Sequence, residues 1–349
     1  MKIAKGLKET QGEEFRLAFG YIHETLSELY GYGDNFFESF VKLDRQALDE
    51  DIPQLVGQFG PDLIHSHNAP DYLTVTALNT IEGTPIIHDL HDSLTMRNTG
   101  YQAGDDEEKL KEYAEKEKIA NERSDGRIYV SRGVRDYVQQ RYDVDPLFGM
   151  VFPNYIPEDL IPHTFSGKIS EGDGEMHVVY AGTISSKVEG HHYDLREIFK
   201  EISGQGVHIH VYASREDEAY MVLAEGDPRI HYHGHLDQKE LLLELTRYDY
   251  GWAGFNDALN SEHLDVVLPN KAFEYIACGL PILTFPHKTL KGFVERHHVG
   301  IALRDLDDLL ADLKKTQGLH ESVNGKRYDF TVEKNIDKLI DYYAGFLEH

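Results

Sequence analysis

The chain has 349 residues, with 61 acidic and 35 basic side chains and a formal charge of −26 at neutral pH. This negative surface disfavours nucleic acid and anionic lipid as bulk partners, since both would be repelled by it. The single cysteine, Cys278, excludes an internal disulfide, and no apolar run reaches the length of a membrane span. Residues 1–15 lack the apolar core of a signal peptide, so we expect a cytoplasmic protein. Peripheral attachment to the inner membrane face is left open but is not indicated.

The first half of the chain alternates short apolar runs with amphipathic stretches, which is the pattern of parallel strands covered by helices. Strands are predicted at residues 14–22, 62–67, 84–91, 126–131 and 149–155. Helices are predicted at residues 47–60, 70–83 and 106–124.

The opening of the chain departs from this pattern. A doubly wound domain should begin with a buried strand that leads into a glycine-rich turn. Residues 2–12, KIAKGLKETQG, have a helical pattern instead. We therefore expect the first strand of the domain to be missing or reduced to residues 1–4.

The second half repeats the alternation from residue 177 onward. Strands are predicted at residues 177–182, 207–214, 229–234, 250–255 and 281–286. Helices are predicted at residues 194–206, 216–226, 237–248, 270–279 and 290–300, with a closing helix at 331–349. Residues 156–175 are polar, contain Gly, Pro and Ser, and are interpreted as an interdomain linker.

The pattern as a whole predicts an α/β protein with two doubly wound, Rossmann-like domains that face each other across a cleft. The first domain covers residues 1–160 and the second covers residues 161–330, followed by the helix at 331–349. Ligands of open α/β sheets bind at the carboxyl ends of the strands, and three segments with polar side chains fall at such ends.

The first segment follows the predicted strand at residues 177–182. Gly182 would let the backbone approach a ligand closely, the N–H groups at the next helix start could hold phosphate, and Lys187 follows nearby. A glycine after a strand is also the ordinary way to make a strand-to-helix turn, so this segment alone does not decide between the two interpretations.

The second segment is LPNKAFEYIACGLPI, residues 268–282. Lys271 at a helix start opposes the helix dipole, which indicates another partner such as a pyrophosphate. Glu274, one turn inside the helix, could accept hydrogen bonds from two ribose hydroxyls. The alternative is a local ion pair between Lys271 and Glu274 at helical spacing.

The third segment is TPIIHDLHDSL, residues 84–94. His91 could donate a hydrogen bond to an oxygen that develops charge, or transfer a proton. A histidine at a strand end is more often a structural hydrogen-bonding residue. The nearby His88, Asp89 and Asp92 favour a functional role.

In this order and spacing, these segments resemble the retaining GT-B glycosyltransferases of family 4. The resemblance is strongest at residues 249–300 and extends to residues 59–74, 84–92, 151–157 and 178–185. It implies a retaining, metal-independent enzyme without a cofactor. Such an enzyme would move a hexose-type sugar from a nucleotide-diphosphate sugar to a glycan or lipid-linked acceptor.

The resemblance also implies roles for single residues. Glu274 matches the family's second motif glutamate, which binds the donor ribose. Asn270 and Lys271 match a variant of the same motif, and Gly182 and Lys187 stand where the family has its phosphate-contacting turn and basic residue.

On the acceptor side, His91 matches the histidine near the transferred sugar and its acceptor. Two features depart from the family pattern. Val266, flanked by Asp265, stands where the family often has another glutamate that faces the hexose. The missing first strand also removes a loop that shapes the acceptor side.

Two other functions remain open from the sequence. A metal-dependent hydrolase could use side chains at the ends of two strands: His65, His67, His88, Asp89, His91 and Asp92. His231, His233 and His235 also alternate onto one face, but the chain has 20 histidines and neither group explains the second domain. The other alternative is a catalytically impaired relative that binds a nucleotide sugar without transferring it.

Overall fold

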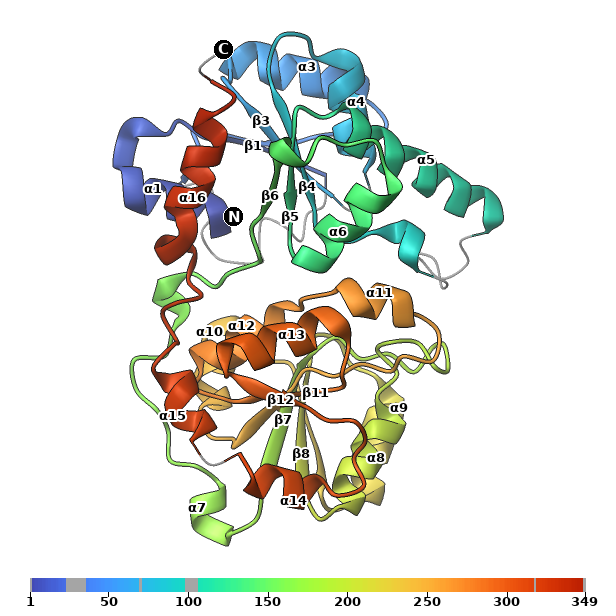
Figure 1. Ribbon diagram of the computed structural model, residues 1–349, viewed down its shortest axis with the longest axis vertical. Helices are drawn as coiled ribbons and strands as arrows, with labels where there is room; N and C mark the ends of the chain where they lie inside the picture. Colours follow the sequence, from blue (N-terminus) through green and yellow to red (C-terminus); the bar gives the residue numbers. More distant parts are fainter. Residues whose placement is uncertain (1, 23–35, 69–70, 98–105, 317, 348–349) are drawn as a thin grey trace. The chain divides into compact units, whose positions relative to one another are not determined.

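The structure is a computed structural model that describes residues 2–22, 36–68, 71–97, 106–316 and 318–347. It comprises two compact units, Met1–Pro153 with Val332–His349, and Asn154–Thr331 (Figure 1). The boundaries expected from sequence were 160/161 and 330/331. Across the described ranges, the helices lack the combination of length and apolar character needed to cross a bilayer.

The first unit contains two parallel sheets. Strands β3 (Ile64–His67), β4 (Ile86–Leu90), β5 (Gly126–Tyr129) and β6 (Gly149–Val151) form a four-stranded sheet in chain order. Strands β1 (Ala18–Tyr21) and β2 (Ser39–Lys42) pair in register as a second, two-stranded sheet. The short strand β2 was not predicted from the sequence.

The helices of the first unit follow its strands and pack on the sheets. They are α3 (Leu48–Phe59), α4 (Tyr72–Thr80), α5 (Glu107–Arg123), α6 (Arg132–Arg141) and α16 (Val332–Ala344). Helices α5 and α6 begin with side-chain caps, in which Asp106 and Ser131 accept from the backbone three residues on.

The chain opens with a helix, α1 (Lys2–Gln11), and not with a strand. Within the described residues, β1 is the first strand, so the expected loss of the opening strand is confirmed. Helix α1 lies beside α16 in Figure 1. A β-carbon on Gly6 would stand 2.5 Å from Val332 Cγ1, so glycine is what lets the two helices approach.

The second unit has one six-stranded parallel sheet in the order β12-β11-β10-β7-β8-β9. Its strands are β7 (His177–Gly182), β8 (His208–Ala213), β9 (Ile230–Gly234), β10 (Tyr250–Trp252), β11 (Ile282–Thr284) and β12 (Gly300–Ala302). This order is that of a doubly wound sheet, with its switch point between β7 and β10. The predicted Rossmann-like architecture is therefore confirmed for this unit.

Helices connect these strands. They are α8 (Arg196–Gly204), α9 (Glu218–Gly226), α10 (Gln238–Leu245), α11 (Ser261–Val266), α12 (Asn270–Ala277), α13 (Lys288–His297), α14 (Leu309–Lys314) and α15 (Leu319–Asn324). The helix predicted at residues 290–300 was too long. His298 adopts a left-handed conformation that ends α13, and Gly300 begins β12, where a β-carbon would overlap the Ile282 carbonyl.

The segment predicted as a linker, residues 156–175, is packed into the second unit. It contains the short helices η5 (Glu158–Leu160) and α7 (Ser170–Asp173), and Ile156 pairs with Thr331 in a parallel bridge. Ile156, Leu160 and Ile161 are buried in the core. The linker interpretation was wrong because the polar composition hid these widely spaced apolar anchors.

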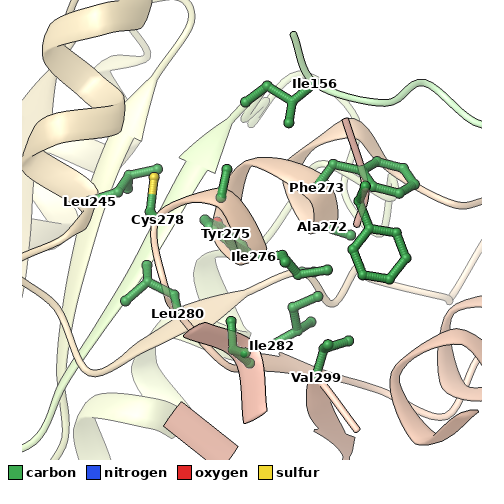
Figure 2. Close-up of a cluster of buried hydrophobic side chains, with 14 of the residues drawn as sticks. Ile156, Leu245, Ala272, Phe273, Tyr275, Ile276, Cys278, Leu280, Ile282 and Val299 are labelled. Carbon is green, nitrogen blue, oxygen red and sulfur yellow. The ribbon is translucent and has the colours of Figure 1, made fainter. Parts of the chain in front are cut away.

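Helix α12 is the centre of this core. Figure 2 shows its apolar side chains, including Phe273 and Ile276, packed with Ile156 and with Ile282 of β11. Cys278 at the end of the helix is fully buried, and its thiol donates to the Leu242 carbonyl at 3.1 Å. The position of α12 on the sheet is therefore fixed along its whole length.

Candidate active site

The switch point of the second sheet is bridged by one tyrosine. Pairing between β7 and β10 ends at Gly251, and the two strands then diverge. The Tyr275 hydroxyl accepts from the Ala181 N–H at 3.0 Å and donates to the Trp252 carbonyl at 3.1 Å. It thus satisfies two backbone groups that the ladder leaves open, and it fixes α12 where open α/β sheets bind ligands.

Lys271 lies one turn before Tyr275 on α12 and is buried with it. Its ammonium group makes no hydrogen bond to any residue that the structure describes. It stands 3.6 Å from the ring centroid of Tyr180 and 5.3 Å from that of Phe255. Burial lowers the pKa of Lys271 to about 7, although the carboxylate of Glu274 acts in the opposite direction. A buried ammonium with unused donors is suited to an anionic ligand.

Gly182 ends β7 directly beside this lysine. A β-carbon on Gly182 would stand 3.1 Å from Lys271 Nζ and 3.3 Å from its Cε. The backbone also has φ of +145°, a conformation that other residues rarely adopt. The glycine therefore leaves room for the Lys271 side chain at the strand end. A close approach of a ligand to this backbone stays a prediction.

Glu274 and Asn270 complete the expected donor residues on α12. Asn270 is exposed at the first position of the helix, and Glu274 is half-buried one turn later. Glu274 forms no ion pair with Lys271, and its carboxylate has no hydrogen bond within the described part of the chain. The structure thus does not support the local ion pair left open by the sequence, and the role of Glu274 at the ribose stays a prediction.

The turn after Gly182 differs from the one predicted. Helix α8 starts only at Arg196, so no helix N-terminus directly follows the glycine. A loop intervenes, in which the backbone N–H and hydroxyl of Ser186 both donate to Asp217, the N-cap residue of α9. Lys187 is exposed on this loop. The helix start expected behind Gly182 is therefore replaced by a loop.

Residues that the sequence analysis missed connect this loop to the loop after β10. The Asn256 amide donates to the Asp194 carbonyl at 3.0 Å, and the Asn260 amide lies 3.0 Å from His192 Nδ1. Asparagines in a polar loop gave no signal that set them apart.

Asp265 could in principle replace the missing family carboxylate next to Val266. In the structure its carboxylate pairs with Lys288 Nζ at 2.5 Å and accepts from the Lys288 backbone N–H at 3.2 Å. These interactions hold the pKa of Asp265 below its ordinary value even though burial acts to raise it. Asp265 is thus engaged at the start of α13.

In the first unit, the carboxyl ends of β3 and β4 bring four polar side chains together. Asp89 Oδ2 lies 3.0 Å from His65 Nε2, 3.1 Å from His67 Nδ1 and 3.3 Å from His91 Nε2. His67 stands opposite Asp89 in the parallel register. Alternate residues of a strand share a face, so His65 and His67 point to the same side of β3. On that side they meet Asp89 and His91, which come from the end of β4.

His88 does not belong to this cluster, contrary to the expectation for a metal site. It points to the other face of β4, where its Nδ1 lies 2.9 Å from Thr74 Oγ1 and its Nε2 lies 3.3 Å from Asp71. Its side chain is fully buried. His88 is therefore a structural hydrogen-bonding residue.

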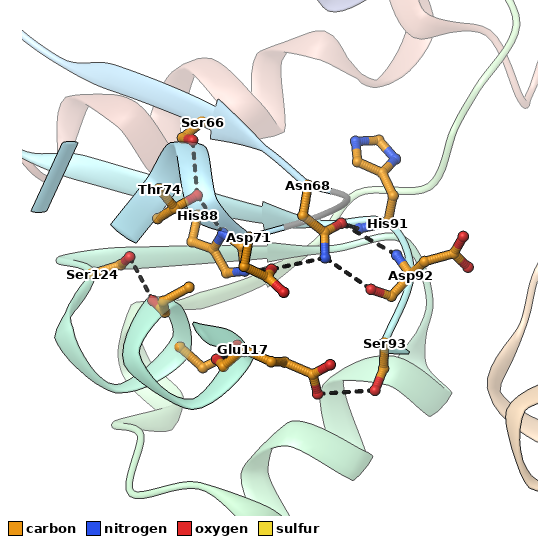
Figure 3. A network of polar contacts seen from close by, with 12 residues as sticks. Ser66, Asn68, Asp71, Thr74, His88, His91, Asp92, Ser93, Glu117 and Ser124 are labelled. Carbon is orange, nitrogen blue, oxygen red and sulfur yellow. Dashed lines mark hydrogen bonds and ion pairs between the residues drawn. The ribbon is translucent and has the colours of Figure 1, made fainter. Parts of the chain in front are cut away.

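The backbone that carries His91 is held by Asn68, a buried residue that the sequence analysis did not single out. The Asn68 side-chain oxygen accepts from the N–H of His91 at 2.7 Å and of Asp92 at 3.3 Å. Its amide donates to the Asp92 carbonyl at 2.8 Å and to Asp71 at 3.0 Å. Figure 3 shows this clamp, together with the hydrogen bond from Ser93 to buried Glu117 beyond it.

In this cluster the charged groups are the Asp89 carboxylate and the His91 imidazole. Burial alone would raise the pKa of Asp89, but His91 and His67 hold it well below its usual range. Burial lowers the pKa of His67 to about 3, with repulsion from His65 acting in the same direction. For His91, burial acts to lower the pKa, but the Asp89 carboxylate raises it above its ordinary value. The arrangement favours a proton on His91 beside an ionised Asp89.

Comparison with known families matches both units. Residues 34–160 match Glycosyltransferase Family 4, and residues 179–322 match the C-terminal domain of Glucosyltransferase 3-like proteins. The chain is a GT-B glycosyltransferase. In this glycosyltransferase, the candidate residues of the second unit lie at the switch point of its sheet, and those of the first unit lie at the carboxyl ends of β3 and β4. Comparison with curated proteins gives no match.

Solved structures share the fold of this glycosyltransferase at low identity. A sucrose-phosphate synthase from Thermosynechococcus elongatus has 15% identity and a TM-score of 0.65 over 88% of this chain and 80% of that one. A glycosyltransferase from Rickettsia africae ESF-5 has 12% identity and a TM-score of 0.67 over 100% and 94%. The co-structure of S. aureus MnaA with UDP has 10% identity and a TM-score of 0.61 over 100% and 94%.

Proposed function

We propose that this glycosyltransferase is a retaining, metal-independent hexosyltransferase that uses a nucleotide-diphosphate sugar and acts on a glycan or lipid-linked acceptor. The observation that carries the proposal is the unpartnered ammonium of Lys271 beside Gly182 at the switch point. A buried cation at this edge of the sheet supports a diphosphate as its ligand.

Each donor residue has a distinct role in this proposal. Lys271 stabilises the charge that develops on the leaving diphosphate, which is the role that a metal ion has in other transferases. The backbone N–H groups of Asn270 and Lys271 at the start of α12 bind the same anion. Glu274 accepts hydrogen bonds from the ribose hydroxyls, the backbone after Gly182 follows the phosphates, and Lys187 adds a cation from the loop.

The acceptor is bound by the first unit in this proposal, with His91 as the residue that contacts the reacting groups. The imidazole beside Asp89 can donate a hydrogen bond to an oxygen that gains charge during transfer. Uridine and glucose are the first donor components to test. MnaA was solved with UDP, and the family matched by the second unit is described as glucosyltransferase-like.

A binding experiment tests the donor site directly. The thermal shift of the full chain is measured with UDP, GDP, ADP and their glucose conjugates. A ligand at a hundred times its Kd should add about 2.7 kcal/mol to the stability of the folded state. The Lys271→Met variant should lose the shift, whereas Lys291→Met, on the exposed face of α13, should keep it. An equal shift in both variants would contradict the donor site.

Transfer itself is tested with the donor that binds best. Formation of a product with retained anomeric configuration on a glycan or lipid-linked acceptor supports the proposal. Nucleotide binding without transfer to any acceptor in a broad panel would instead identify the catalytically impaired relative. The hydrolase interpretation has no support from the family matches, which both describe glycosyltransferases.

A further inference from the structure

In the cluster at the ends of β3 and β4, three histidines surround one carboxylate, although a histidine–aspartate hydrogen bond requires only one histidine. Three ring nitrogens lie within 3.3 Å of the same oxygen, Asp89 Oδ2. Two of these nitrogens, His67 Nδ1 and His91 Nε2, are also only 2.9 Å from each other. The two nitrogens and the oxygen therefore form a triangle with all three sides at hydrogen-bond distance.

Hydrogen bonds alone do not satisfy this triangle. A hydrogen between His67 and His91 leaves one nitrogen lone pair directed at the carboxylate, which offers only lone pairs. If both nitrogens donate to Asp89 instead, two N–H dipoles lie side by side at 2.9 Å. One of the three contacts is uncompensated in either arrangement. A cation at the centre would attract all of the lone pairs.

We propose that His65, His67 and Asp89 bind one divalent transition-metal ion of the zinc class, with His91 beside the site. Zinc binds imidazole nitrogen and carboxylate oxygen at about 2.0–2.1 Å, which places tetrahedral ligand atoms about 3.3–3.4 Å apart. The separations of Asp89 Oδ2 from His65 Nε2, 3.0 Å, and from His67 Nδ1, 3.1 Å, are close to that spacing. The ligand atoms of His65, His67 and Asp89 lie within 4.8 Å of one another. A small outward movement of the side chains would admit the ion.

The surroundings of the cluster fit a metal site. His65 Nδ1 lies 2.6 Å from the Tyr343 hydroxyl of α16, so it can donate there and direct the Nε2 lone pair at the ion. The other oxygen of Asp89, Oδ1, is buried without a hydrogen-bond partner in the described residues. The side chains of His67 and His91 are 40% and 28% exposed, which gives the ion a path from solvent.

The ligand set determines what the ion can do. Three protein ligands leave the fourth position of a tetrahedral shell open. His91 Nε2 lies 2.9 Å from His67 Nδ1 and 3.3 Å from Asp89 Oδ2. If His91 acts on the acceptor, as the proposed function holds, a cation bound to these two neighbours would oppose the protonation of His91 and inhibit transfer. The site is thus proposed to make the enzyme sensitive to free zinc.

Cobalt(II) is the probe for the test, because four-coordinate cobalt absorbs far more strongly in the visible range than six-coordinate cobalt. The full chain is treated with chelator and titrated with Co²⁺, with stoichiometry measured by calorimetry. We expect one ion per chain and an intense visible band that zinc abolishes. Asp89→Asn and His67→Ala should lose the band. Tyr343→Phe should weaken cobalt binding about 10- to 100-fold, as expected for a residue that orients a ligand.

His231→Ala and His235→Ala are the matched controls, because both remove a histidine of the second unit and should bind cobalt as the wild type does. The proposal is overturned if the wild type binds no cobalt, if Asp89→Asn and His67→Ala bind it equally well, or if His231→Ala alone abolishes binding. Should Asp89→Asn fail to fold, the more exposed His67 still decides the outcome. Cobalt binding needs no donor or acceptor, so failure of the proposed transferase activity would not affect this result.

Discussion

Lys271 Nζ lies 3.1 Å from the point at which Gly182 would carry a β-carbon. The strand end and the helix start thus meet at the switch point with only a hydrogen atom of glycine between them. A substitution at either residue should therefore affect the other.

Replacement of Gly182 by alanine tests this relationship. The new methyl group would press on Lys271, and the φ of +145° is unfavourable for alanine. We expect Gly182→Ala to lower stability by about 1 kcal/mol or more and to weaken nucleotide binding. Gly204→Ala is the control, because that glycine is in α8 and a β-carbon there meets no atom within 4 Å. It should leave binding unchanged and raise the melting temperature; equal effects of both variants would argue against a role for Gly182.

The pH dependence of Lys271 gives a second prediction. Its pKa is about 7 in the folded protein and 10.5 in the unfolded chain, so the unfolded state binds more protons between these values. The group therefore destabilises the empty protein fully below pH 7, and this effect disappears as pH rises toward 10.5. Lys271→Met should raise the melting temperature most at pH 6 and hardly at all near pH 10. Wild-type affinity for UDP should fall as pH rises above 7, because binding requires the charged form; calorimetry at several pH values measures this.

Gly182 and Lys271, which the structure brings together, were both singled out by signals in the sequence. Gly182 closes an apolar strand, and Lys271 opposes the dipole of a helix framed by Pro269 and Gly279. The anchoring role of Tyr275 could not be predicted, because it depends on where β7 and β10 diverge. That divergence depends on the order of strands in the sheet, which a single sequence does not specify.

In the first unit, the sequence failed to predict the contacts of His88 and Asn68. His88 and His91 were grouped because they are close in the sequence, yet they lie on opposite faces of β4 and only His91 reaches Asp89. Asn68 was missed because its contacts are to the backbone of residues 91 and 92, and no side-chain pattern shows such contacts. The sequence pattern therefore does not determine which face of a strand meets a partner, or which side chains bind the backbone of a neighbouring loop.

Glu274 provides a third prediction. Charge-assisted hydrogen bonds to ribose hydroxyls are worth about 1.5–3 kcal/mol each, so Glu274→Gln should weaken nucleotide binding about tenfold or more. The carboxylate pairs with no described residue, so the melting temperature of the empty protein should change little. Glu240→Gln, on α10, is the control and should leave the affinity unchanged. A 2′,3′-dideoxy nucleotide should reproduce the loss on the wild type, and equal affinity for both nucleotides would refute the ribose role.

Five stacked histidines on β7, β8 and β9 give a prediction about acid stability. They are His177, His208, His210, His231 and His233, and His210 lies 2.9 Å from both His177 Nδ1 and His233 Nε2. Burial, followed by repulsion from His231, lowers the pKa of His210 to about 2, and the pKa values of His231 and His233 are also lowered. In the unfolded chain these groups take up protons near pH 6.5, so stability should fall as pH decreases below 6.5.

The size of this effect can be measured on one residue. A histidine that stays neutral in the folded state contributes a loss of about 2 kcal/mol between pH 6.5 and pH 5. His210→Gln should therefore flatten the decline in melting temperature between pH 7 and pH 5, whatever its stability at neutral pH. The exposed His163→Gln should keep the wild-type slope. Parallel slopes for wild type and His210→Gln would show that His210 is protonated in the folded protein.

The last prediction separates His91, the proposed catalytic group of the acceptor side, from Asn68, the residue that positions it. His91→Ala removes the imidazole, and Asn68→Ala removes the hydrogen bonds that hold its backbone. Both variants should reduce kcat strongly, while the Kd for the nucleotide should stay within about twofold, because neither residue belongs to the donor-binding unit. Asn68→Ala should also lower stability by about 1–3 kcal/mol, because it leaves buried backbone groups unpaired. His91→Ala should lower stability less, since its side chain is 28% exposed.

Asn68→Asp keeps the oxygen that accepts from His91 and Asp92 and should recover part of the lost kcat. If His91→Ala weakens nucleotide binding as much as it slows turnover, His91 is structural and another residue must contact the acceptor.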